Sequence, residues 1–187
     1  VDFQWNRVRA PTTCPKEDAV LFKVGDKVVY PNHGVGVIEQ IMDASSSGVD
    51  STFYRLRILA NDSTVLVPTS NTLQVGLRKV LSKKDVDKVF KVLRTGKVEI
   101  TSDWKGRFQE NSDKMRTGDI YEVARVLKNL TYLSKSKNLS YRERKMLDKS
   151  KYLIVSEIAE VANVPEDQIE AKVDKAVSVA GKSATDN

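Results

Sequence analysis

Few side chains in this 187-residue sequence could act as a nucleophile, a proton carrier or a metal ligand. The sequence has one cysteine, Cys14, and one histidine, His33, whereas a structural zinc site uses about four Cys or His ligands. It contains no GxSxG, Walker A or HExxH motif, so the signatures of common hydrolases, nucleotide-binding proteins and zinc proteases are missing. We therefore expect a protein that is not an enzyme and that uses no metal, no cofactor and no small-molecule substrate.

The sequence also indicates where the protein works. A lone cysteine cannot form an internal disulfide, which favours a reducing compartment. No apolar run approaches the roughly 18 residues that a membrane-spanning helix requires. Residues 1–20 lack the basic start and apolar stretch of a signal peptide. We expect a cytoplasmic protein without a membrane partner, in which residues 1–20 form an N-terminal extension that is flexible or not native to the protein.

Positive charge is concentrated in the middle of the chain. Residues 78–152 hold 21 Lys and Arg against 10 Asp and Glu, whereas residues 1–77 hold 7 against 8 and residues 153–187 hold 3 against 7. Such a block is the electrostatic signature of a module that binds nucleic acid. Solvated helix faces are the alternative, but the abrupt change near residue 78 argues against it.

The elements that must position these charges begin with a β-rich segment. Short apolar runs alternate in the manner of strands and are separated by turns rich in Gly, Asn, Asp and Ser. Gly34 and Gly36 form a GxG between two of these runs, and the lack of a following helix favours a hairpin turn over a phosphate-binding loop. The runs, at residues 22–30, 35–41, 52–59 and 63–68, predict a small antiparallel half-barrel.

Beyond this segment the apolar residues recur every three or four positions, which predicts helices. Caps are indicated at Ser82 and Asp103, and Thr117 leads a third helix. The sequence SYRE at 140–143 has the form of a capping box, in which the Ser and Glu side chains bond the exposed amides of the first turn. Pro165 is placed to end that helix and to start the last one.

Seven segments follow one another in the order FKVGDKVVYPNHGVG, FYRLRIL, VLVP, VGLRKV, the tryptophan segment SDWKGRF, TGDIYEVARVLKNL and LSYRERKMLDKSKYL. In this order they resemble the CarD/CdnL family of bacterial transcription regulators. The resemblance covers about residues 21–180, and the N-terminal part is also similar to the polymerase-interacting domain of the transcription-repair coupling factor.

The resemblance implies an α+β fold and a transcriptional function. A Tudor-like antiparallel β half-barrel at 21–77 would dock on the β subunit of bacterial RNA polymerase. A compact, all-helical, basic domain at 78–181 would contact the minor groove of promoter DNA, without sequence specificity, at the upstream edge of the melted region. The implied result is a more stable open complex, with nucleoid association through the polymerase. The sequence itself indicates a frayed tail at 182–187, after Gly181.

The implied polymerase-binding surface falls on the third and fourth β runs. The strand TVLVP supplies Leu66 and Pro68, and Leu56 is carried over from the neighbouring strand. Leu56 alternates in phase with apolar residues, so a core position is an equal alternative for it. Arg55 and Arg57 have the opposite phase and are expected to reach either an acidic partner or solvent.

The implied DNA-binding wedge is Trp104, in the segment SDWKGRF. A planar side chain at a helix start can insert beside an unstacked base in the minor groove, and stacking on an exposed base contributes about 1–3 kcal/mol. A core position is the alternative for Trp104. Gly106 stands where relatives carry a basic residue, so Lys105 is expected to substitute. The residues expected to bind phosphates around the wedge are Lys105, Arg107, Lys114, Arg116, Arg142, Arg144 and Lys145.

Two other functions fit the same charge pattern. A general architectural DNA-binding protein would use the basic domain alone, and an isolated 78–180 fragment would then bind any duplex without the polymerase. A protein–protein adaptor would direct the basic face to an acidic partner and would retain no DNA.

Overall fold

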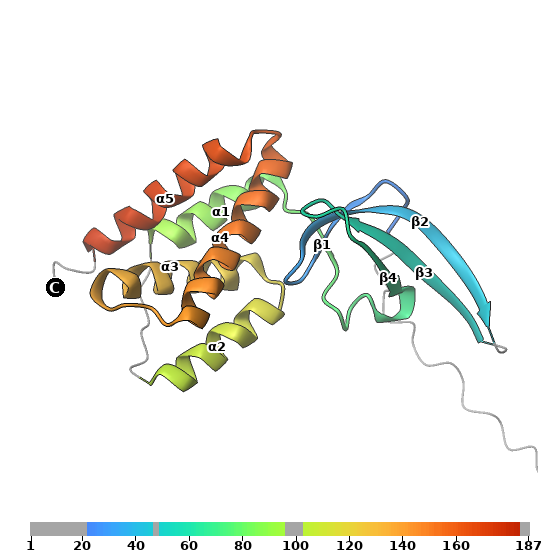
Figure 1. The fold of residues 1–187 in the computed structure, drawn as a ribbon. Helices are drawn as coiled ribbons and strands as arrows, with labels where there is room; N and C mark the ends of the chain where they lie inside the picture. The colour runs from blue at the N-terminus through green and yellow to red at the C-terminus, as the bar shows by residue number, and fades with distance from the viewer. Residues whose placement is uncertain (1–21, 47–48, 96–102, 184–187) are drawn as a thin grey trace, which may run out of the picture.

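A computed structural model of the chain describes residues 22–46, 49–95 and 103–183 (Figure 1). A five-stranded antiparallel sheet is followed by five helices, so the predicted α+β class and the Tudor-like half-barrel are confirmed. The sheet and the helical bundle lie side by side, and α4 of the bundle contacts β2 (Figure 1). The expected N-terminal extension at 1–20 lies outside the described residues. No helix in the described part of the chain is long and apolar enough to cross a membrane.

The sheet has the strand order β4-β3-β2-β1-β5, so β4 and β5 form its two edges. Pairing of Arg78 and Lys79 with β1 extends the sheet two residues beyond Leu77, where the helical part was expected to begin. Two residues are too few to show a strand pattern in a sequence. The elements are β1 (Lys27–Tyr30), β2 (Gly34–Ser46), β3 (Val49–Ile58), β4 (Thr64–Pro68), the short 3-10 helix η1 (Thr69–Asn71) and β5 (Arg78–Lys79).

The core of the sheet is built from the alternating residues of β3. Tyr54, Leu56 and Ile58 are all buried, because successive side chains of a strand point to opposite faces. A bulge between Ile38 and Gln40 shifts the register of β2 against β3. Leu56 packs so closely on β2 that a Cβ at Gly36 would lie 2.8 Å from Leu56 Cδ1.

The bundle contains the helices that the sequence predicts, with one different start. Ser82 and Asp103 cap the first two helices, and the capping box of Ser140 and Glu143 is present. The third helix starts after Asp119 instead of Thr117, because the Asp119 carboxylate accepts the Tyr121 N–H at 2.8 Å. The helices are α1 (Lys83–Arg94), α2 (Trp104–Arg116), α3 (Ile120–Ser136), α4 (Tyr141–Ala162) and α5 (Glu166–Ser183).

The far end of the bundle continues a little beyond the expected boundary. Pro165 separates α4 from α5, and α4 ends in a left-handed Asn163. The last helix reaches Ser183, two residues into the segment expected to be frayed, and residues 184–187 lie outside the described residues. Its apolar stripe packs into the bundle core through Ile169, Val173, Ala176 and Val177.

An ion pair between a partly exposed arginine and a buried glutamate joins the sheet to the bundle. Arg78 of β5 donates to both carboxylate oxygens of Glu157 on α4, at 2.6 and 2.8 Å, and the Leu81 N–H donates to Oε1 at 3.0 Å. Arg78 Nε also donates to the Gly118 carbonyl at 2.9 Å. Glu157 is 1% exposed, so water competes little for these bonds. This arrangement joins the sheet to α4 and to the loop that leads to α3.

Candidate nucleic-acid interface

Trp104 is the first residue of α2 and is exposed. Asp103 caps the helix by accepting the N–H groups of Lys105 at 3.2 Å and Gly106 at 2.8 Å. The Trp104 side chain is 44% exposed, so the core alternative for it is wrong. Its ring lies 6.4 Å from that of Phe108, one helical turn away, as expected of side chains four residues apart.

Arg107, expected to bind a phosphate, is instead part of an ion pair inside the bundle. Its Nε and Nη2 donate to Glu143 Oε1 at 3.0 and 2.6 Å. The Arg107 side chain is 13% exposed, and its position between α2 and α4 leaves little of it for a partner. Arg107 therefore holds α2 against α4, a role that the spacing of the sequence could not reveal.

Glu143 uses its two oxygens for two different elements. Oε1 accepts the bonds from Arg107, while Oε2 accepts the Ser140 N–H at 3.0 Å and the Ser140 hydroxyl at 2.8 Å. Burial by itself would raise the pKa of Glu143, but the bonds from Arg107 and Ser140 outweigh it and lower that pKa below its ordinary value. The capping box of α4 is thus also the anchor of α2.

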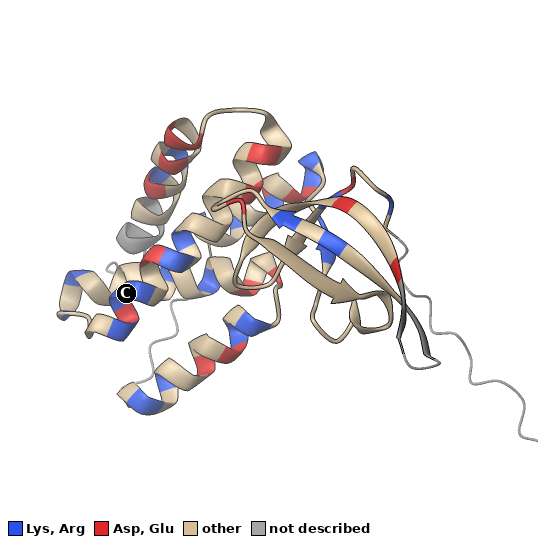
Figure 2. Ribbon diagram, turned by 45° about the vertical axis from the view of Figure 1, so that its right-hand side comes forward, with Lys and Arg blue, Asp and Glu red and all other residues tan. Residues whose placement is uncertain are grey.

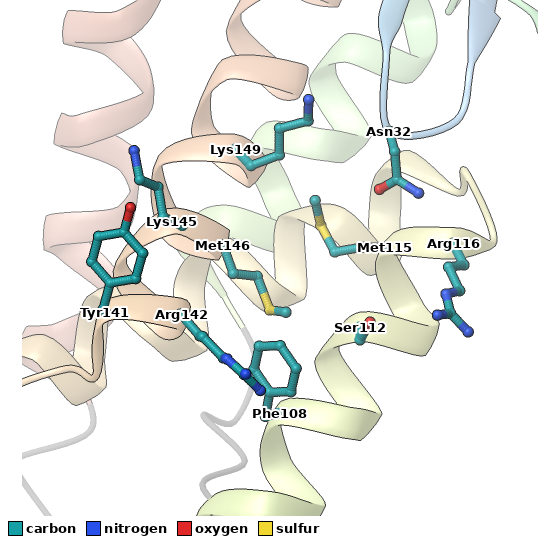
Figure 3. A pocket seen from close by; sticks show the side chains of 10 residues that line it. All are labelled: Asn32, Phe108, Ser112, Met115, Arg116, Tyr141, Arg142, Lys145, Met146 and Lys149. Carbon is teal, nitrogen blue, oxygen red and sulfur yellow. The ribbon is translucent and has the colours of Figure 1, made fainter.

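An open groove runs between α2 and α4, and we call it the α2–α4 groove (Figure 3). Its volume is about 510 Å³. Met115 and Met146 lie in the middle of the view, with Tyr141 and Lys145 toward one end and Arg116 with Asn32 toward the other (Figure 3). The lining residues are Asn32, Phe108, Ser112, Met115, Arg116, Tyr141, Arg142, Lys145, Met146 and Lys149.

Some of the predicted basic residues line the α2–α4 groove, together with residues that were not predicted. Arg116, Arg142 and Lys145 line it together. Lys149 and the 76% exposed Tyr141 also line it, although the sequence did not single them out. Their spacing of four residues along α4, at 141, 145 and 149, is the signal that could have identified them, because residues four apart share one helix face.

The remaining predicted bases lie outside the groove. Lys105 and Arg144 are exposed, whereas Lys114 pairs with Glu110 at 2.6 Å along α2. Figure 2 shows basic segments at both ends of α2 and acidic ones between them. The positive surface is therefore made by the ends of α2 and the first turns of α4, with Lys114 partly neutralised.

The residues expected to bind a polymerase divide between the core and one face of the sheet. Leu56 is fully buried, so it is a core residue and cannot form part of a docking surface. Leu66 is 55% exposed on the edge strand β4 and pairs across the ladder with Arg55, while Pro68 pairs with Phe53. We call this surface, formed by Met42, Phe53, Arg55, Leu66 and Pro68, the β3–β4 face.

Arg57 lies on the same side of β3 but forms ion pairs with two acidic residues. Its Nε donates to Glu39 Oε1 at 2.6 Å and its Nη1 to Asp62 Oδ1 at 2.9 Å. Arg55 lies 3.6 Å from Glu39 Oε2, beyond hydrogen-bond distance. Arg55 is therefore the arginine of this pair that is better placed to reach a partner.

Comparison with known proteins matches the two parts of the structure separately. Residues 22–81 match the family model described as "CarD-like/TRCF RID domain", and residues 88–174 match the model described as "CarD, C-terminal domain". The chain is also 32% identical, over 151 residues, to "Putative transcription factor YdeB" of Bacillus subtilis (strain 168). That alignment covers 81% of this chain and 99% of the relative.

Proposed function

The chain belongs to the CarD family, and on that premise we propose that it is a transcription regulator that binds the RNA polymerase β subunit and stabilises the open promoter complex. The observation that carries the proposal is the exposed Trp104 at the capped start of α2, beside a basic surface. We expect the protein to recognise the shape and charge of DNA and not its base sequence, because phosphate contacts position a protein on DNA without reading bases.

The polymerase contact is assigned to the β3–β4 face. The match of residues 22–81 to a domain model named in part for the transcription-repair coupling factor supports this assignment. An edge strand presents unpaired backbone groups that can extend a partner's sheet. Leu66 and Pro68 on β4 add apolar area, and Arg55 adds a charge next to them.

The DNA contact is assigned to Trp104 and the bases around it. A wedge in the minor groove costs a few kcal/mol of base unstacking, and that cost is lower at the edge of a melted region, where stacking is already broken. We assign the phosphate contacts to Lys105, Arg116, Arg142, Arg144 and Lys145, which are exposed or line the α2–α4 groove. Arg107 is left out because it pairs with Glu143.

The test is the lifetime of the open complex with Trp104→Ala. Loss of about 1–2 kcal/mol of stacking should shorten the lifetime roughly five- to thirtyfold, since 1.4 kcal/mol corresponds to a factor of ten. Trp104→Phe, which keeps a planar ring, should retain much of the effect. An unchanged lifetime with Trp104→Ala, in a protein that still binds the polymerase, would falsify the wedge.

A further inference from the structure

The α2–α4 groove combines two properties that the Trp104 wedge does not explain. Its floor contains the ring of Phe108 and the side chains of Met115 and Met146. Among its described lining residues four are Lys or Arg and none is Asp or Glu. A solvated helix face does not need an apolar floor, and a duplex held only by its phosphates does not need one either.

The cations of the groove have few partners inside the protein. No ion pair joins Arg142, Lys145 or Lys149 to an acid in the described part of the chain. Arg142 lies instead 6.0 Å above the Phe108 ring, and Lys145 lies 5.7 Å from the Tyr141 ring. Arg142 and Lys145 also stand in the first turns of α4, where the helix dipole favours negative charge. The groove therefore favours an anionic partner.

The aromatic residues indicate the chemistry of that partner. Tyr141 is 76% exposed, so its ring is available for stacking. Phe108 links the groove to Trp104, because its ring lies 6.4 Å from the indole on one side and beneath Arg142 on the other. Aromatic rings beside a basic groove are the usual means of binding single-stranded nucleic acid, since every base has a flat face that can stack.

We propose that the α2–α4 groove holds unpaired nucleotides of a single DNA strand, with a base against Tyr141 and the apolar floor and the phosphates on the basic rim. The volume of about 510 Å³ lies in the range of ligand-binding clefts. Paired bases stay stacked inside a duplex and cannot reach the floor. This inference rests on the DNA contact proposed above and adds a strand separated at the melted region as the partner.

The test uses the full chain without polymerase. Fluorescence anisotropy compares a short labelled oligothymidine with a duplex of the same length at one salt concentration. Tyr141→Ala should weaken binding of the oligothymidine about tenfold, within the range for loss of one stacked base, and should change duplex binding less than about twofold. Tyr141→Phe, which keeps the ring, should bind like the unchanged protein.

A second variant tests the floor independently of Tyr141. Ser112 lines the groove on α2, so Ser112→Phe fills the groove while all four cations remain. It should also weaken single-strand binding and spare the duplex. The proposal is overturned if a variant weakens the binding of both DNA forms equally. It is also overturned if either one of the two variants binds the single strand normally.

Two competitors of the oligothymidine test whether the groove binds a free nucleotide or an acidic protein segment instead. If thymidine monophosphate binds as tightly as the oligothymidine, the groove serves a free nucleotide and the proposal is wrong. It is also wrong if an acidic peptide of equal charge displaces the oligothymidine equally well. These measurements contain no polymerase, so an unchanged open-complex lifetime with Trp104→Ala removes the proposed Trp104 wedge without deciding what the groove binds. Normal single-strand binding by Tyr141→Ala removes the groove alone.

Discussion

At the scale of single residues, Gly106 stands in the tryptophan segment where the family resemblance leads us to expect a basic residue. A Cβ added there would lie 2.9 Å from Asp103 Oδ2, which is the end of a side chain that can move. Gly106 lies inside α2 and has no positive φ, so its backbone does not require glycine, and glycine there costs about 0.5–1 kcal/mol relative to alanine. Gly106 therefore reduces the positive charge beside the wedge without a strong structural demand.

We predict that Gly106→Lys strengthens DNA binding and makes it more dependent on salt. One additional phosphate contact should steepen the slope of log K against log salt by about 0.9 for duplex DNA. The gain in helix propensity and the disturbance of the Asp103 cap, each about 1 kcal/mol, should leave stability nearly unchanged. Titrations at several salt concentrations measure the slope. Gly106→Ala is the control, and a lysine variant with the same slope as alanine contradicts the prediction.

At the scale of secondary-structure elements, the Glu143 carboxylate joins the N-terminus of α4 to the first turns of α2. Glu143 completes the capping box with Ser140 and accepts the bonds from Arg107. Because Trp104 stands one turn before Arg107 on the same helix, this carboxylate also orients the proposed wedge. A buried carboxylate with these donors is stabilised in its charged form.

The lowered pKa of Glu143 predicts a pH-dependent contribution to stability. A folded-state pKa below the ordinary value of 4.5 stabilises the fold at pH above 4.5, and this stabilisation is lost as the pH falls through the folded-state pKa. Glu143→Gln should lower the free energy of unfolding by about 1.5–3 kcal/mol at neutral pH. Urea unfolding of both proteins at neutral and acidic pH should show the difference shrinking below pH 4.5. A difference that stays constant with pH would show that the negative charge of Glu143 does not contribute to stability.

The edge strand β4 carries the second prediction at this scale. Leu66 is exposed beside Arg55, and burying a leucine in an interface contributes about 1.5–3 kcal/mol. Leu66→Glu should therefore weaken polymerase binding at least about tenfold, measured by pull-down titration or surface plasmon resonance. Leu73→Glu is a matched control, because Leu73 is 54% exposed but lies outside the β3–β4 face. Equal binding by both variants would place the docking surface elsewhere.

At the scale of the whole molecule, the two proposed contacts lie in different units, so their effect depends on how firmly these units are joined. Strands β3 and β4 lie in the sheet, and α2 lies in the bundle (Figure 1). The β3–β4 face therefore belongs to the sheet, and Trp104, the first residue of α2, belongs to the bundle. Glu157, which is buried, receives bonds from β5 and from the segment that leads to α1. A regulator bound to the polymerase through one unit positions its wedge only if the connection is rigid.

We predict that Glu157→Gln uncouples the two contacts. Binding to the polymerase alone and to duplex DNA alone should stay within about twofold, while the open-complex lifetime should fall about tenfold, equivalent to about 1.4 kcal/mol of lost positioning. Lys27→Gln is the control, because it breaks a more exposed ion pair with Glu160 at the same junction, and exposed pairs contribute about 0–1 kcal/mol. A normal lifetime with Glu157→Gln would show that a fixed orientation is not required.

The sequence alone determined the features that depend on neighbours within a few residues. Alternation placed Tyr54 and Ile58 in the sheet core, and capping residues such as Asp103 located helix starts. Strand pleat and helix pitch are local geometry, so their periods appear directly in the order of residues. The family, and with it the fold class, followed from several such motifs in sequence.

Only the tertiary structure decided which side chains are available to a partner. It buried Leu56, paired Arg107 with Glu143 thirty-six residues away, and brought Tyr141 and Lys149 to the groove beside Phe108. Arg78 and Glu157 are separated by 79 residues. The physical reason is that a sequence does not show whether a charged side chain faces solvent or an opposite charge. The packing of elements that are distant in the chain decides this.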